Sequence, residues 1–194
     1  NPVRCPVTDP ATRQGKERLF AEGGFFTPDK RAQFVATSWR PVASGGRQFP
    51  FLLNTGRIRD QWHTMTRTGR VPRLMTHQDE PYLEIHPEDA ARFGIEDGGL
   101  LRIETAHGAA TVRGRLNDGQ RRGEVFAPMH WTDQFSASGP INRLVTAVRD
   151  PVSGQPELKA TPARLAPVPT LWRGVLLSHD TRMPRGSLYA ARIP

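Results

Sequence analysis

The sequence predicts a mainly β protein with one or two short helices, folded as a small closed barrel. Pro and Gly together make up 36 of 194 residues, about 19%, which indicates many turns. The apolar residues occur in short runs bounded by turn residues, a pattern typical of short strands. Strands of this kind favour a closed barrel over a sandwich. The hydrophobic content of 37% excludes disorder of the whole chain.

Residues 1–48 are expected to form a lead-in segment ahead of the barrel. Pro28-Asp29 lies between two apolar pairs and predicts a small hairpin there. The chain begins at Asn1 without a Met or an apolar leader, so we expect a processed protein or a piece of a longer one. The aromatic side chains of this segment need a surface to cover them: Phe20, Phe25, Phe26, Phe34 and Trp39.

The barrel is expected to span residues 49–168 and to open with a strand over the apolar run 49–54. This strand ends at the glycine turn Thr55-Gly56-Arg57. A polar stretch of about 20 residues follows, and loops of such length in compact domains are usually functional. We expect residues 56–78 to be mobile without a ligand. The stretch holds one acid, Asp60, and five arginines: Arg57, Arg59, Arg67, Arg70 and Arg73.

A second strand is predicted over residues 82–85, followed by a short helix over 87–93. Pro87 suits the first turn of a helix, the acids after it favour the N-terminal end of the helix dipole, and Gly94 ends the helix. In residues 101–105 and 112–116, apolar or small residues alternate with charged ones, which predicts a hairpin with one buried face.

The rest of the barrel is predicted from two shorter runs. Residues 124–128 form a strand, residues 129–162 are irregular, and residues 163–168 return as a last strand. Residues 169–194 are then a C-terminal extension.

The chain is basic, and almost all of the positive charge is guanidinium. Lys and Arg number 27 against 19 Asp and Glu, which gives a net charge of +8, and only three of the 27 are Lys. The planar guanidinium matches phosphate and carboxylate groups, so an anionic partner is expected. The arginines are spread along the chain without a known nucleic-acid motif, so we expect no nucleic-acid partner. A free-standing basic barrel that binds anions or nucleic acid is the alternative.

Several kinds of site are excluded or disfavoured. A single cysteine, Cys5, excludes an internal disulfide and any site made of cysteines alone. The six histidines lack metal-ligand spacing, and the adjacent residues Ser178-His179-Asp180 cannot converge as a triad does. No apolar run is long enough to span a membrane, so no membrane partner is expected. We therefore expect neither metal ligands nor catalytic residues in this chain.

The glycine turn after the first strand is the leading candidate for a binding site. Glycine permits close backbone approach to a ligand, threonine and arginine can hold phosphate oxygens, and tryptophan offers a stacking face. An ordinary solvated loop is the alternative. The residues concerned are Thr55, Gly56, Arg57, Trp62, His63 and Thr64.

Four residues farther along are weaker candidates. His130 and Trp131 follow a predicted strand, and strands often place polar and aromatic groups in a pocket at their ends. A buried histidine with a purely structural role is an equally good interpretation of His130. Asn142 and Lys159 lie in irregular segments, where each alone indicates a turn or a solvated charge.

Taken together, these motifs resemble the molybdopterin oxidoreductases. The run from Asn54 to Gly69 resembles the family's dinucleotide-binding segment, and residues 90–98 with the following hairpin resemble its C-terminal signature. Residues 127–131, Asn142 and residues 150–159 are most similar to assimilatory nitrate reductases. The lead-in residues 18–20 and 26–29 are similar to the segment preceding this domain in those enzymes.

The resemblance implies a double-psi β-barrel of the aspartate-decarboxylase-like kind. It implies that residues 55–64 clasp one dinucleotide of bis(molybdopterin guanine dinucleotide), with Asn142 and Lys159 completing the site. His130 and Trp131 would lie near the pterin and the substrate funnel.

The resemblance also implies a parent enzyme, cytoplasmic, that reduces nitrate to nitrite at molybdenum. Its electrons would come from a donor protein or domain through an iron–sulfur cluster held upstream of this chain. This chain alone would be inactive and would partner the rest of the enzyme. The same domain of a formate dehydrogenase or a periplasmic nitrate reductase is the alternative.

Overall fold

The structure, a computed structural model, describes residues 11, 15, 18–36, 38, 45–151, 153–177 and 189–191. The chain divides into two compact units, Asn1–Arg40 and Pro41–Pro194. The division falls inside the lead-in that the sequence places before residue 49. Cys5, Trp39 and the Ser178-His179-Asp180 run lie outside the described residues.

The first unit has the predicted turn at Pro28-Asp29, but the predicted hairpin is wrong. The backbone N–H of Phe25 donates to the carbonyl of Lys30 at 3.1 Å, yet none of the described residues 18–36 is in a strand. The Thr27 hydroxyl donates to the carbonyl of Arg31 at 2.7 Å, so a side chain closes the turn. Side-chain hydrogen bonds of this kind compete with strand pairing.

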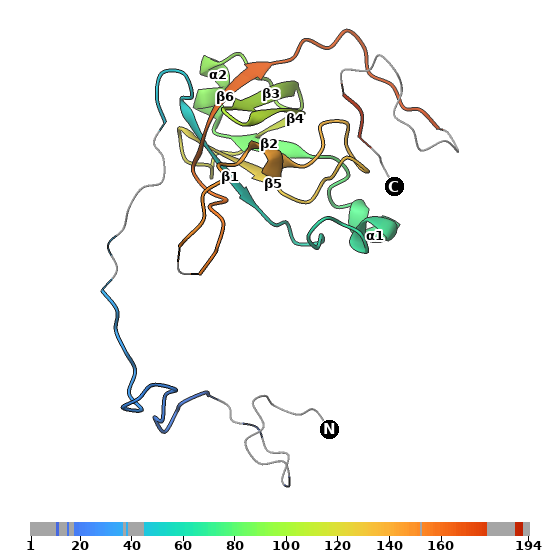
Figure 1. Ribbon diagram of the computed structural model, residues 1–194. Coiled ribbons are helices and arrows are strands. Elements are labelled where there is room, and N and C mark those ends of the chain that lie inside the picture. Colours follow the sequence, from blue (N-terminus) through green and yellow to red (C-terminus); the bar gives the residue numbers. More distant parts are fainter. Residues whose placement is uncertain are drawn as a thin grey trace. The chain divides into compact units, whose positions relative to one another are not determined.

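The second unit is a closed barrel of six strands, labelled in Figure 1. Their order around the barrel is β1-β5-β2-β4-β3-β6, so every connection except that between β3 and β4 skips one neighbouring strand. Two pairs, β1 with β5 and β2 with β4, are parallel. This arrangement confirms the predicted double-psi β-barrel. The strands are β1 Phe51–Gly56, β2 Tyr82–Ile85, β3 Leu100–Thr105, β4 Gly108–Leu116, β5 Glu124–Pro128 and β6 Thr161–Pro167.

The predicted hairpin in the second unit forms β3 and β4, which pair antiparallel from Leu100 opposite Arg113 to Thr105 opposite Gly108. Leu101 and Ile103 are fully buried, whereas Arg102 between them is exposed. Since successive side chains of a strand point to opposite faces, the alternation read from the sequence places the apolar face in the barrel interior. This interior is the larger of the two apolar clusters found among the described residues.

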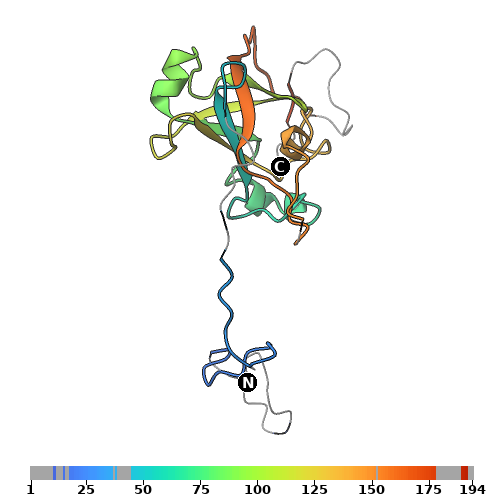
Figure 2. The same ribbon diagram turned by 60° about the vertical axis from the view of Figure 1, so that its left-hand side comes forward.

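Two short helices lie at opposite ends of the barrel in both views (Figures 1 and 2). The predicted helix is α2, Pro87–Arg92; the His86 ring accepts from the Glu88 N–H at its start, and Gly94 takes a φ of +64° after its end. At the other end, the polar stretch after β1 contains the 3-10 helix η1, Thr68–Arg70, and the helix α1, Pro72–Met75. No helix in the described part of the chain has the length and apolar character needed to cross a membrane.

Residues 189–191 lie against the barrel. The carbonyl of Ala190 accepts from the N–H of Ala137 at 2.9 Å, and the Tyr189 hydroxyl donates to the Glu80 carboxylate at 3.2 Å. Burial raises the pKa of Tyr189 above its ordinary value, so this hydroxyl remains a donor at neutral pH. Arg113 of β4 pairs with the same carboxylate.

Candidate functional site

The candidate site is built on the end of the barrel where β1 and β5 finish. The two strands run parallel, with Gly56 opposite Pro128, and the Met129 N–H donates to the Gly56 carbonyl at 2.9 Å. Parallel strands deliver the residues that follow them to the same edge. The segment after Gly56 and the segment after Pro128 therefore meet here, although some 70 residues separate them.

Lys159 reaches this end from the segment before β6. Its ammonium donates a hydrogen bond to the carbonyl of Thr55. The buried Thr55 hydroxyl donates to the carbonyl of Leu158 at 2.9 Å, so residue 158 lies alongside the end of β1. The structure thus brings together three of the predicted residues, Thr55, Gly56 and Lys159.

The backbone at Gly56, which we call the glycine cradle, lies close to this ammonium. A Cβ added there would lie 2.8 Å from Cε2 of Phe126 and 3.6 Å from Nζ of Lys159. The absence of a side chain therefore lets the Phe126 ring and a positive charge lie close to the Gly56 backbone. Glycine is also the residue that lets an anionic ligand approach a main chain closely.

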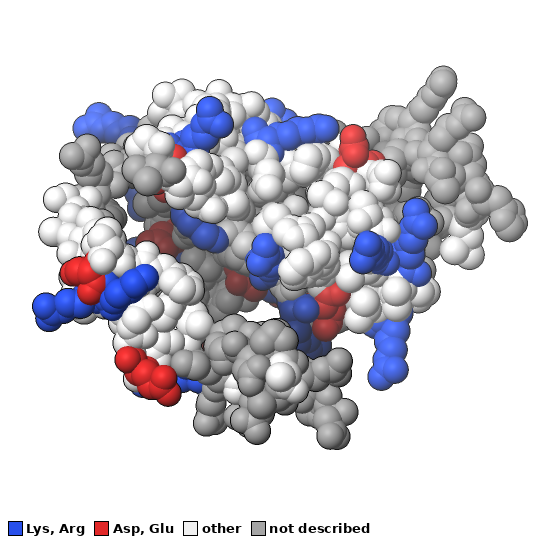
Figure 3. Space-filling view, turned by 60° about the horizontal axis from the view of Figure 1, so that its bottom comes forward, with Lys and Arg blue, Asp and Glu red and all other residues white. Residues whose placement is uncertain are grey.

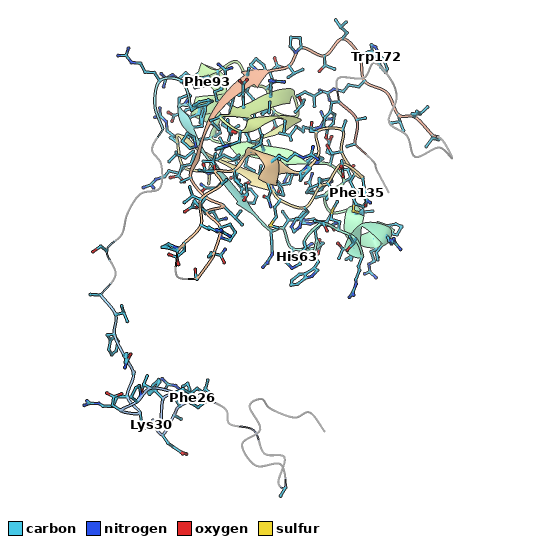
Figure 4. The ribbon with its side chains drawn as sticks, in the orientation of Figure 1. Phe26, Lys30, His63, Phe93, Phe135 and Trp172 are labelled. Atoms are coloured by element: carbon cyan, nitrogen blue, oxygen red, sulfur yellow. The ribbon has the colours of Figure 1, made fainter. Side chains whose placement is uncertain are left out.

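Three exposed side chains of the loop that follows Gly56 lie close to one another. The Arg57 guanidinium carbon lies 5.3 Å from the centroid of the Trp62 ring, and the Trp62 and His63 rings meet edge-on at 4.5 Å. Trp62 is 60% exposed, so one aromatic face is open to solvent. Figure 4 shows His63 at the solvent edge of this end of the molecule. Thr64 is also exposed.

His130 lies beneath these residues and is fully buried. Its Nε2 accepts a hydrogen bond from the Ile58 N–H at 3.0 Å, and its Nδ1 lies 2.7 Å from the His63 carbonyl oxygen. Burial lowers the pKa of His130 below its ordinary value, and the neighbouring charges of Arg57 and His63 lower it further. His130 therefore joins the site through backbone groups of the loop.

Trp131 belongs to a small apolar cluster that we call the loop core. Its members are Met65, Met75, Trp131 and Phe135, with Ile58 packed against them. The Trp131 ring is fully buried, and its Nε1 has no hydrogen-bond partner within the described residues. The structure therefore places Trp131 under the loop, not on its surface.

Asn142 lies on the 3-10 helix η2, Ile141–Leu144, which packs near β4. Its Oδ1 is buried and lacks a partner among the described residues. A buried acceptor without a donor costs free energy, so this atom is one that a bound ligand or water would satisfy. Within the part of the chain described, no hydrogen bond or ring contact joins Asn142 to the other predicted residues.

Gln61 supports the loop from inside, a role that sequence reasoning missed. It is 4% exposed; its amide nitrogen donates to the carbonyl of Leu74 at 3.3 Å, and its amide oxygen accepts from the Thr68 hydroxyl at 2.7 Å. These bonds tie α1 and η1 to the chain leaving β1. The sequence carries no signal for this burial, because Gln61 lies in a polar stretch without periodicity.

The loop has a surplus of positive charge. Its one acid, Asp60, is held by Arg59 at 3.1 Å and His77 at 2.8 Å, and the hydrogen bond from Arg59 lowers the pKa of that carboxyl. In the face drawn in Figure 3, the basic side chains stand in separate groups with uncharged surface between them. No group of three or more His, Cys, Asp or Glu in the described residues is placed to hold a metal ion.

Comparison with known families identifies the family to which this barrel belongs. A model of the molydopterin dinucleotide-binding domain matches residues 51–162, more than half of the chain and all of β1 to β5. The chain belongs to this family. The matched range includes every predicted site residue from Thr55 to Lys159.

Several much longer proteins contain a region similar to this chain. The chain is 50% identical over 180 residues to a nitrate reductase of Klebsiella oxytoca, covering 92% of this chain and 20% of that protein. It is 32% identical over 167 residues to the assimilatory nitrate reductase catalytic subunit of Bacillus subtilis, covering 84% and 22%. Formate dehydrogenases are also among the relatives at 32% identity. The domain thus spans about a fifth of the length of these relatives.

A solved structure supports the fold alone. The acetylene hydratase of Pelobacter acetylenicus matches with a TM-score of 0.53 at 18% identity, covering 62% of this chain and 18% of that one.

The residues present fit a pterin dinucleotide. Lys159 and Arg57 supply positive charge beside a glycine cradle, which suits a pyrophosphate. Trp62 offers an open aromatic face to a ring system, and the unpartnered Oδ1 of Asn142 can accept from a ring N–H. The donor set therefore matches the chemistry of the family's ligand.

Proposed function

We propose that this chain is the C-terminal cofactor-binding domain of a molybdenum nitrate reductase and that it holds one half of bis(molybdopterin guanine dinucleotide). The observation that carries the proposal is the glycine cradle at Gly56, flanked by Lys159 and Arg57. The similarity to nitrate reductases over most of the chain supports the same conclusion.

The cofactor supplies the redox chemistry that converts nitrate to nitrite. This domain supplies binding and orientation. Lys159 and Arg57 neutralise the pyrophosphate, Trp62 stacks on the guanine, and Asn142 accepts a hydrogen bond from a ring nitrogen. His130 and Trp131 are buried under the loop and support it, His130 through backbone hydrogen bonds and Trp131 through apolar packing.

Electrons are proposed to arrive from a donor protein or domain through an iron–sulfur cluster held elsewhere in the parent enzyme, and the enzyme is proposed to be cytoplasmic. Formate oxidation is the second candidate activity, because formate dehydrogenases are among the relatives. Assay of the intact parent with nitrate and with formate separates the two. The 194-residue chain alone is expected to reduce no nitrate with a viologen donor, because the redox chemistry belongs to the cofactor.

Calorimetric titration of the purified chain with GDP tests the cofactor half of the proposal. We expect GDP to bind more tightly than ADP, and Lys159→Ala to weaken GDP binding about tenfold, equivalent to ~1.4 kcal/mol. Arg121→Ala is the matched control, because Arg121 is exposed and pairs with Glu124 at the start of β5, away from the cradle.

Three outcomes would contradict the proposal. These are equal binding of GDP and ADP, GDP binding that Lys159→Ala leaves unchanged, and salt-dependent binding of DNA or RNA without any response to guanine nucleotides. The last outcome favours the free-standing basic barrel.

A further inference from the structure

We propose that His130 is a positioning residue: its neutral imidazole, protonated on Nδ1, clamps the backbone at Ile58 and His63 and so fixes the surface that the loop presents to the dinucleotide. This role differs from that of a cofactor ligand, because the fully buried ring contacts only backbone groups of the loop in the hydrogen bonds described. The inference rests on the proposed function for the identity of the bound ligand.

The two partners of the ring allow one protonation state. The Ile58 N–H can only donate, so Nε2 must accept it and carries no hydrogen. The His63 carbonyl oxygen can only accept, so Nδ1 must carry the hydrogen that reaches it at 2.7 Å. The other tautomer or an imidazolium would set the Nε2 hydrogen against the Ile58 N–H, and a flipped ring would place carbon atoms at both positions.

The clamp acts on a segment whose backbone needs external support. His63 takes a φ of +44° and Met65 a φ of +60°, values in the left-handed region that non-glycine residues seldom adopt. The Met65 N–H closes this turn by donating to the Trp62 carbonyl at 3.0 Å. The His130 ring binds the carbonyl of His63 inside this turn, and the side chain of Met65, the last residue of the turn, is buried in the loop core.

The exposed side chains of the site are next to the clamped positions. The ring binds the Ile58 N–H, in the peptide bond that directly follows Arg57, and the His63 carbonyl, one residue after Trp62. It therefore holds the backbone near both of the side chains that contact one another at the surface, Arg57 and Trp62. A fixed spacing between a phosphate-binding cation and an aromatic face lowers the entropy lost when a dinucleotide binds.

Acid is expected to release the clamp. A proton on Nε2 would face the Ile58 N–H, and burial and the charges of Arg57 and His63 oppose the imidazolium. The hydrogen bond to the His63 carbonyl favours the imidazolium, but the net shift of the His130 pKa is downward. Since the folded-state pKa of His130 lies below its ordinary value, the clamp is complete above about pH 6.5. Its contribution decreases as the pH falls below that value, continuing down to the lowered pKa.

Three variants of the 194-residue chain separate the two bonds. His130→Gln keeps an acceptor near the position of Nε2, His130→Asn keeps a donor near that of Nδ1, and His130→Leu keeps neither. His86→Asn is the control, because residue 86 caps α2 at the other end of the barrel and asparagine is a good cap.

Nitrogen NMR of the ring and hydrogen exchange of the Ile58 amide test the clamp without a ligand, and exchange of the Leu53 amide reports whether the barrel is intact. We expect an Nδ1–H tautomer at neutral pH. His130→Leu should speed Ile58 exchange and weaken GDP binding, each about tenfold, while Leu53 stays protected. His130→Gln should restore Ile58 protection, and His130→Asn should not.

An Nε2–H tautomer, or wild-type Ile58 protection and GDP affinity in His130→Leu, would overturn the inference. If the wild-type chain binds no GDP at all, the proposed function fails, and the clamp is decided by the ring tautomer and Ile58 exchange alone. A GDP affinity that falls in acid equally in wild type and His130→Gln would also overturn it.

Discussion

The barrel and the loop beside it each have an apolar core, and the two cores are built differently. The barrel core takes residues from all six strands, such as the fully buried Leu53, Leu83 and Leu101. The loop core has four buried members, and two of them are the flexible residues Met65 and Met75. Stability and site shape therefore reside in different parts of one domain.

The two regions also differ in what holds their backbone. The barrel is closed by strand pairing, in which each strand supports its neighbours. The loop has backbone hydrogen bonds of its own, but only between residues a few positions apart. Its more distant parts are joined by single side chains, chiefly His130 and Gln61. Such a loop can open locally at a lower free energy than the barrel unfolds.

The largest expected effect comes from the barrel core. Leu101→Ala removes a fully buried side chain from β3 and should reduce the free energy of unfolding by about 2–5 kcal/mol. Urea denaturation followed by far-ultraviolet circular dichroism measures it. Leu177→Ala, at a position 89% exposed, is the control and should change stability little. A loss below about 1 kcal/mol in Leu101→Ala would mean that the barrel core does not carry the stability.

The barrel could be predicted from the sequence because its burial follows the strand period. The bounds of β2 and β5 agree with the predicted ranges 82–85 and 124–128, and β1 lies two residues later than expected. Alternation in β3 and β4 identified the buried face correctly. These elements depend on local pattern, which a sequence displays directly.

The loop could not be predicted in the same way. Helices η1 and α1 lie in a stretch predicted only as a loop, and the burial of Gln61 and Met65 depends on side chains that arrive from beyond residue 129. The lead-in hairpin was wrong because the Thr27 hydroxyl closes the turn in place of strand pairing. For the candidate site, the family resemblance placed Lys159 with Thr55, and the structure shows a hydrogen bond between them although they are more than 100 residues apart in the sequence.

A smaller effect, confined to the loop, is expected from Gly69→Ala. The added Cβ would lie 2.7 Å from Cζ of the buried Phe135 ring and 3.1 Å from Cβ of Met65, so the loop core must shift. Overpacking of this kind costs about 1–3 kcal/mol. Hydrogen exchange should show faster exchange at the Met65 amide and unchanged exchange at Leu53. Gly69→Ala combined with Phe135→Leu should recover part of the loss. Equal loss of protection in β1 would show that loop and barrel open as one unit.

The smallest effect on stability, together with a clear effect on binding, is expected from Trp62→Ala. The side chain is 60% exposed, so its removal should change the free energy of unfolding by no more than about 0.5 kcal/mol. Stacking of a base on an aromatic ring contributes about 1–3 kcal/mol, so GDP affinity should fall at least about fivefold. Trp172→Ala, at a position 81% exposed on the segment after β6, is the control and should alter neither property. Unchanged GDP affinity in Trp62→Ala would show that Trp62 does not stack on the base. A loss of more than about 1 kcal/mol in the free energy of unfolding would show that the exposed side chains of the loop also support the loop core.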